Sequence, residues 1–150
     1  MLTLKNAQTL VQNVTQDAEN TAFDSSNYCS VTTEDGIILH LQFNPDLGVL
    51  DVVGPIGELS EENSEEALSV FKELMNQNLL WMGTHGATIS FVPEANVFVL
   101  QRRYDGNEDS PEDFENFVLS FVDEIRLWSD KYNGLLEQED EGVGQFSIKI

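Results

Sequence analysis

The chain has 150 residues and a net charge of −20, with 27 acidic and only 7 basic side chains. Such a charge repels phosphate backbones and anionic lipid head groups, which argues against nucleic acid and membrane surfaces as partners. Its length favours one domain with a real core, since 41% of the residues are hydrophobic. No stretch approaches the roughly 20 apolar residues of a membrane span and no secretory signal is recognisable, which predicts a cytoplasmic protein.

The first part of the chain predicts one helix and three strands. Apolar residues recur at spacings of three and four over residues 4–18, as in an amphipathic helix. Residues 28–33 are expected to form a strand, and an Asp-Gly turn leads into an alternating strand over residues 37–43. A third strand over residues 49–53 should end at Gly54-Pro55.

The rest of the chain predicts a helix, two strands and a last helix. A serine followed by two glutamates favours a helix start at Ser60, and its apolar stripe continues to Gln77. Residues 88–92 and 97–102 are expected to be strands. Ser110-Pro111, followed by two acids, predicts the start of the last helix, which should end at Asn133-Gly134.

The order α-β-β-β-α-β-β-α, without regular βαβ alternation, predicts an α+β sandwich. In it, one mainly antiparallel, twisted sheet would be packed with helices. We expect residues 1–132 to form the domain and residues 133–150 to form an acidic, flexible C-terminal tail.

The sequence offers no catalytic group. Cys29 is the single cysteine, which excludes an internal disulfide and a cysteine-based zinc site, and we expect it to be buried. His40 and His85 are the only histidines and are expected on a strand surface and in a loop. We therefore predict no enzyme, no cofactor and no metal site.

A calcium loop is an alternative that the sequence argues against. Asp105, Asn107 and Asp109 fall at the first, third and fifth positions of an EF-hand loop. The pattern then fails, because Ser110 replaces the turn glycine and Asn116 stands where a bidentate glutamate is needed.

Several local sequences, taken in order, resemble the class I type III secretion chaperones, the family typified by the chaperone of the translocated intimin receptor. The clearest is residues 78–90, NLLWMGTHGATIS. Glu34-Asp35-Gly36 before an alternating strand is similar, as is GPIGEL at residues 54–59, which leads from a strand into the second helix. The last helix matches in placement and aromatic content. The resemblance covers residues 1–132.

This resemblance implies a homodimer that binds the N-terminal segment of a secreted effector in extended form. The chaperone would keep that segment soluble and secretion-competent and deliver it to the secretion apparatus, including its ATPase. It implies neither catalysis nor a cofactor. A protein-binding or scaffold module of the same fold, outside any secretion system, is the alternative, because a fold does not fix a function.

The resemblance also indicates two surfaces. The dimer interface would lie on the second helix and its neighbouring strand, although the same side chains can pack on the chain's own sheet. Its predicted residues are Leu68, Phe71, Leu74, Met75 and Trp81. The effector surface would lie on the first helix and early strands, unless a helix covers these residues. Its predicted residues are Leu4, Leu10, Val11, Ile38, Leu50 and Val52.

The acidity itself has two interpretations. It keeps the protein soluble, or it also steers a basic effector segment toward the binding surface.

Overall fold

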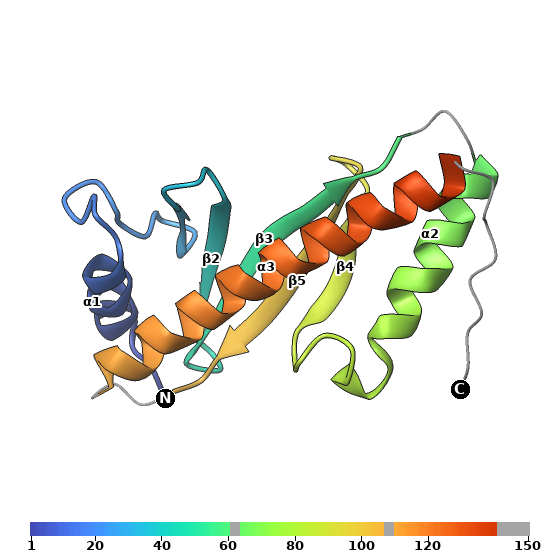
Figure 1. The fold of residues 1–150 in the computed structure, drawn as a ribbon. Helices are drawn as coiled ribbons and strands as arrows, with labels where there is room; N and C mark the ends of the chain where they lie inside the picture. The colour runs from blue at the N-terminus through green and yellow to red at the C-terminus, as the bar shows by residue number, and fades with distance from the viewer. Residues whose placement is uncertain (61–63, 107–109, 141–150) are drawn as a thin grey trace. The chain divides into compact units, whose positions relative to one another are not determined.

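In the computed structural model, which describes residues 1–60, 64–106 and 110–140 (the last four by their backbone alone), three helices accompany five strands (Figure 1). The elements are α1 (Leu4–Val14), β1 (Tyr28–Thr32), β2 (Ile38–Asn44), β3 (Val49–Glu58), α2 (Ser64–Gln77), the short 3-10 helix η1 (Leu79–Trp81), β4 (Thr88–Val92), β5 (Val97–Tyr104) and α3 (Pro111–Asp140). The strands form one sheet in the order β1-β2-β3-β5-β4. The predicted α+β class and element order are confirmed.

The chain divides into two compact units. Unit 1 combines Met1–Gly54 with Gln101–Asp123, and unit 2 combines Pro55–Leu100 with the chain from Glu124 onward. The two long strands β3 and β5 and the helix α3 each contribute residues to both units.

Unit 1 is built on the antiparallel pairing of β1, β2 and β3. Side chains alternate along β2 as the sequence predicts, because neighbouring residues of a strand point to opposite faces. Leu39, Leu41 and Phe43 are buried, whereas Ile38, His40 and Gln42 are exposed. Apolar residues of α1 and of the start of α3 are buried as well, among them Leu10, Val11, Phe114 and Phe121.

Unit 2 has an aromatic core. Phe71 of α2 contacts Phe91 of β4 and Phe98 of β5, with ring centroids 4.8 and 4.9 Å apart. The Tyr132 hydroxyl of α3 donates a hydrogen bond to the Glu58 carbonyl at 2.6 Å. Its ring leaves room only for a glycine at position 57, where an added Cβ would lie 2.1 Å from it.

The first helix is shorter than predicted. It begins after Thr3, whose hydroxyl accepts from the Asn6 amide, and ends at Val14 instead of reaching residue 18. Beyond it, Thr15 accepts from the Asp17 amide, and Thr21 donates to the Asp17 carbonyl. These local side-chain bonds compete with the helical ones and form a turn instead.

The third strand continues past its predicted end at Gly54-Pro55, up to Glu58. Its pairing with β2 runs only from Val49 to Val53. Pro55 therefore lies beyond the part of β3 that pairs with β2. The N–H that proline lacks is not needed for a hydrogen bond to β2, so the proline does not end the strand.

The last helix also continues past its predicted end. It passes through Asn133-Gly134 to Asp140, so the expected boundary between domain and tail falls inside α3. A glycine costs a helix only about 1 kcal/mol relative to alanine, and the strong helix formers Leu135 and Leu136 follow it. The rest of the predicted tail, residues 141–150, and the predicted first turn of α2, residues 61–63, lie outside the described residues.

Candidate partner-binding surfaces

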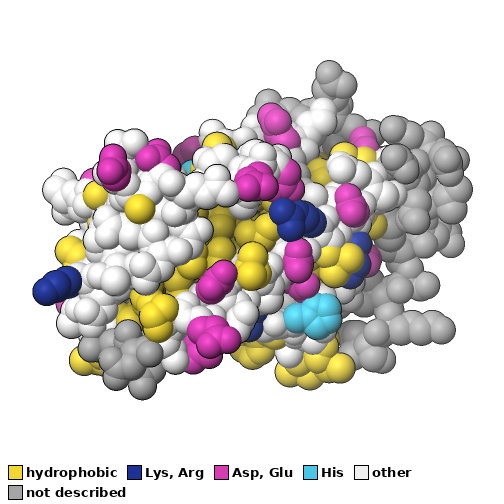
Figure 2. Space-filling view, turned by 60° about the vertical axis from the view of Figure 1, so that its left-hand side comes forward, with side chains coloured by type: hydrophobic (Ala, Val, Ile, Leu, Met, Phe, Trp, Pro, Cys, Tyr) yellow, Lys and Arg dark blue, Asp and Glu magenta, His cyan; other side chains and the backbone are white. Residues whose placement is uncertain are grey.

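Large apolar side chains are exposed in both units. Figure 2 shows one face of the molecule, on which hydrophobic side chains lie among many acidic ones and few basic ones. The densest run is Leu79-Leu80-Trp81-Met82, four consecutive residues that are 55–77% exposed. We call these four residues the apolar knob. Contiguous apolar surface of this kind usually marks a site where another molecule binds.

The backbone of the knob has an uncommon conformation. Leu80 (φ 56°) and Trp81 (φ 55°) both lie in the left-handed region, although neither is glycine. This conformation costs roughly 1–2 kcal/mol per residue, and such costs concentrate at functional sites. It ends the helical path after α2 and leaves all four side chains in solvent.

Asn78 fixes the knob at its start. Its side-chain amide donates to the Ile89 carbonyl at 2.8 Å, and its side-chain oxygen accepts from the Ile89 N–H at 2.7 Å. The Trp81 indole N–H donates to the Thr88 hydroxyl at 3.2 Å. The knob is therefore attached to β4 through three side-chain hydrogen bonds.

The segment after the knob is fixed as well. Thr84 is fully buried, and its hydroxyl donates to the Ala87 carbonyl. Gly83 lies against Gln77 of α2, where an added Cβ would lie 2.4 Å from the side-chain oxygen. His85 Nδ1 lies 2.5 Å from a carboxylate oxygen of Glu124 on α3. The apolar side chains are thus presented by an ordered loop, which reduces the entropy lost on binding.

The predicted dimer residues divide between the surface and the core of unit 2. Leu68, Met75 and Trp81 are exposed, and Phe71 is half-buried in the aromatic core. Leu74 is fully buried. Leu74 therefore belongs to the core of unit 2 and is not available to a partner.

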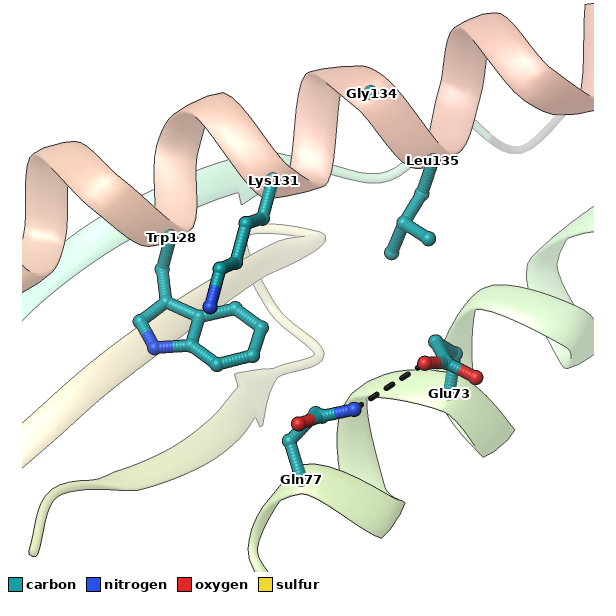
Figure 3. A pocket seen from close by; sticks show the side chains of 6 residues that line it. All are labelled: Glu73, Gln77, Trp128, Lys131, Gly134 and Leu135. Atoms are coloured by element: carbon teal, nitrogen blue, oxygen red, sulfur yellow. Dashed lines mark hydrogen bonds between the residues drawn. The ribbon is translucent and has the colours of Figure 1, made fainter. Parts of the chain in front are cut away.

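Beside the knob, α2 and α3 enclose an open hollow of about 380 Å³. In Figure 3, Trp128, Lys131 and Leu135 extend from α3 toward α2, and Gln77 of α2 donates to Glu73 at 3.2 Å. The Lys131 ammonium lies 4.4 Å from the centre of a Trp128 ring, a cation–π contact. Gly134 completes the lining, and an added Cβ there would meet nothing within 4 Å.

In unit 1, the structure separates the predicted effector-binding residues into two groups. Leu4 and Ile38 are exposed, at 40% and 45%. The other four are at most 2% exposed and belong to the core of unit 1: Leu10, Val11, Leu50 and Val52. Of the two alternatives that the sequence leaves open, the structure shows the covered one for Leu50 and Val52, because these residues pair with Phe43 and Leu41 and share their buried face of the sheet.

Ile38 belongs to a largely polar outer face of the sheet. Next to it on β2, His40 Nδ1 lies 2.6 Å from the Tyr28 hydroxyl of β1. On β5, Arg103 donates from Nε to Asp51 of β3 at 2.7 Å, and this carboxylate raises the pKa of the guanidinium. Arg102, the preceding residue of β5, lies over the Phe117 ring of α3.

A second exposed apolar group of unit 1 joins the predicted Leu4 to two residues that the sequence did not indicate, Met1 and Leu47. The Leu2 N–H donates to the Gly48 carbonyl at 2.9 Å, which fastens the start of the chain to the turn between β2 and β3. Met1 lies so close to Gly48 that an added Cβ would be 2.7 Å from it. Met1, Leu4 and Leu47, all exposed, flank this junction, and we call them the N-terminal cluster.

The groups that could carry other chemistry are few. Cys29 is a free, buried thiol whose pKa is raised to about 11, first by burial and then by the charge of Asp24. Such a thiol is a poor nucleophile at neutral pH. Within the described residues, no group of three or more potential metal ligands occurs and no helix is both long and apolar enough to cross a bilayer.

The chain also matches a known protein family. A model of the Tir chaperone protein (CesT) family matches residues 8–129. The chain belongs to this family. It is therefore a type III secretion chaperone that binds effectors, as the sequence resemblance implied.

Two solved structures have a similar fold. One chain from the "Crystal Structure of the ExsC-ExsE Complex" aligns with a TM-score of 0.70 and 14% identity, over 87% of this chaperone and 96% of that chain. One from the "Structure of the HopA1-SchA Chaperone-Effector Complex" aligns with a TM-score of 0.53 and 12% identity, over 87% and 99%. At these identities the likeness concerns the fold. No curated protein sequence matches closely enough to be counted as a relative.

Sequence reasoning missed part of the surface of this chaperone. It selected Trp81 but not Leu79, Leu80 and Met82. The available signal was a run of four large apolar residues that continues past the stripe of α2 and ends at Gly83. Such a run cannot be buried on one face of a helix. No comparable pattern indicates the N-terminal cluster, because Leu47 lies 43 residues after Leu4 in the sequence.

Proposed function

We propose that this chaperone acts as a homodimer that binds the N-terminal segment of a cognate effector in extended form and keeps it soluble and secretion-competent. Membership of the Tir chaperone protein (CesT) family carries the proposal. The exposed apolar residues of the two units support it, because an effector and a second subunit both need uncovered apolar surface.

For the effector we propose the surface of unit 1. Leu4 and Ile38 are its directly accessible members, and the N-terminal cluster adds Met1 and Leu47. Leu10, Val11, Leu50 and Val52 form the packed layer under this surface. An unfolded segment loses entropy when it is ordered, so it must cover a large surface. Dispersed apolar contacts between polar groups suit such a ligand better than one deep pocket does.

For the second subunit we propose the surface of unit 2. Six exposed side chains belong to α2 and the knob: Leu68, Met75, Leu79, Leu80, Trp81 and Met82. At about 200 Å² for a fully exposed large side chain, they offer roughly 700 Å² of apolar surface. Two subunits would then cover roughly 1,400 Å², within the range of about 1,200–2,000 Å² for specific interfaces.

The remaining parts of the proposal follow from the family and the charge. We expect the chaperone to work in the cytoplasm, by binding and without catalysis, and to present its effector to the secretion ATPase. A net charge of −20 would speed the approach of a basic effector segment at low salt. It would affect the rate of association more than the affinity.

The test begins with the chaperone tagged in its native cell and the bound protein identified by mass spectrometry. That protein is then purified and digested alone and with the chaperone. We expect protection of a segment within its first hundred or so residues. The Leu4→Asp/Ile38→Asp double variant should protect it at least tenfold less well. Leu119→Asp is the matched control, because Leu119 is an exposed leucine of unit 1 that belongs to α3 and is not one of the proposed effector-binding residues.

A bound protein that is protected equally by the wild type and the folded double variant would remove unit 1 from the proposal. A bound protein protected only in a folded internal domain would contradict the chaperone mechanism itself.

A further inference from the structure

Unit 2 carries a protrusion and a recess near the same end of one helix. The knob begins at Leu79, two residues after α2 ends at Gln77. The hollow is lined by Gln77 itself and by Glu73, one turn earlier. The Gln77 side chain also lies against Gly83, the residue directly after the knob, so the two features are neighbours in the folded unit.

The symmetry of a homodimer relates these two features. In a twofold dimer the same surface of both subunits meets, so a group that protrudes from one subunit needs a recess on that same surface of the other. We infer that the apolar knob of each subunit inserts into the hollow between α2 and α3 of its partner. This inference rests on the proposed homodimer and specifies which residues meet in it.

The hollow has the chemistry that such an insertion needs. Trp128 and Leu135 give it apolar walls, and the methylene groups of Lys131 lie against the indole. Its volume of about 380 Å³ falls in the range of roughly 300–1,000 Å³ at which protein pockets hold small ligands. It can therefore accommodate large aliphatic side chains.

Gly134 is the residue that the insertion explains best. Glycine is unfavourable inside a helix, and position 134 is helical with open space around it. No contact within the described chain explains why a glycine is needed at this position. A group that enters the hollow from outside would explain it, because a larger residue at position 134 would project into the hollow.

The knob in turn has members that suit insertion. Leu80 and Met82 are its most exposed side chains, at 71% and 77%. Methionine adapts to irregular recesses through its flexible thioether chain. The Trp81 N–H is already bound to Thr88, so burial of the indole against a partner leaves no unpaired donor. Glu73 and Lys131 would lie around the insertion as a polar rim.

Cross-linking between different subunits tests the contact directly. Met82→Cys and Gly134→Cys are made as separate full-length variants, mixed to exchange subunits and oxidised mildly. We expect a covalent dimer in the mixture and not in either variant alone. The native Cys29 stays silent because it is buried and holds its proton. Asn133→Cys replaces Gly134→Cys as the control, since it lies one residue away and does not line the hollow.

Filling the hollow is the second measurement. Gly134→Trp should raise the Kd of self-association at least tenfold, whereas Asn133→Trp, at an exposed neighbouring position, should change it less than twofold. The cross-link decides if Gly134→Trp fails to fold, because a cysteine is small.

The outcomes separate the inference from the proposed function. A wild-type chain that is monomeric at micromolar concentration would overturn both the homodimer and this contact. A dimer without the 82–134 cross-link, in which Gly134→Trp associates normally, would overturn the contact alone. If Gly134→Trp dimerises normally but loses its effector, the hollow belongs to the effector and the inference is wrong.

Discussion

Unit 1 and unit 2 place their apolar residues differently. In unit 1, strand alternation puts nearly every large apolar residue of β2 and β3 inside, and Ile38 is the exposed exception on β2. In unit 2, four consecutive apolar residues stay outside, held by hydrogen bonds of Asn78 and Thr84 and by two left-handed residues. Burial thus follows from periodicity where the backbone is regular. Where a loop follows the helix, strained backbone conformations keep apolar residues exposed.

The largest expected effect contrasts the two faces of the sheet in unit 1. Leu50→Asp puts a carboxylate at a fully buried position and should lower the free energy of unfolding by about 4 kcal/mol or more. Ile38→Asp on the exposed face should lower it by only about 1 kcal/mol, mainly through the lower strand propensity of aspartate. Urea unfolding measures both. Equal midpoints for the two variants would contradict the assignment of the faces.

The next effect concerns the titratable group in the core of unit 1. The folded pKa of Cys29, about 11, lies above the ordinary thiol value, so the folded state keeps a proton that the unfolded chain releases. Stability is then fully present below about pH 9 and falls by about 2–3 kcal/mol as pH rises to 11. Urea unfolding of the wild type and Cys29→Val across this range isolates the thiol. Parallel curves for the two proteins would contradict the prediction.

For unit 2, truncation of the knob should affect association and not folding. Trp81→Ala removes the largest exposed side chain of the knob, and we expect the Kd of the homodimer to rise about 30-fold, or about 2 kcal/mol. Sedimentation equilibrium measures it. Leu127→Ala, at another exposed position of unit 2, is the matched control. A Trp81→Ala variant that associates like the control would shift the proposed interface away from the knob.

The smallest effect is expected at Gly134, with Gly57 as its contrast in unit 2. Gly134→Ala meets no neighbour and should raise the free energy of unfolding of the subunit by about 0.5–1 kcal/mol through helix propensity. Gly57→Ala would push a methyl group into the Tyr132 ring and should be destabilising. Thermal unfolding at matched concentration compares them. Loss of stability in Gly134→Ala would mean that the helix needs this glycine for its own conformation.

The sequence was sufficient to predict the fold because each signal was local. The alternation of β2 and the Ser110-Pro111 helix start predicted their elements correctly. Local rules failed where a neighbour decides. Pro55 does not end β3 because β2 no longer pairs there, and Gly134 does not end α3 because its neighbours are strong helix formers.

The surfaces were less predictable for a similar reason. Which side of β3 is covered depends on packing that no single strand encodes, so the sequence leaves open whether Leu50 and Val52 are exposed or buried. The left-handed pair Leu80-Trp81 has no propensity signal at all, since neither residue favours that conformation. The N-terminal cluster depends on a backbone contact between Leu2 and Gly48, which only the folded chain brings together.

The bond pair between Asn78 and Ile89 has a consequence of its own. β4 is the terminal strand of the sheet, and the Asn78 amide binds both the N–H and the C=O of Ile89, as the backbone of a further strand would. A terminal strand with free backbone groups invites stacking of sheets from other molecules. Because the Asn78 side chain occupies that position, another chain cannot add a strand there. This protection matters for a protein that must keep apolar surface exposed in order to bind its effector.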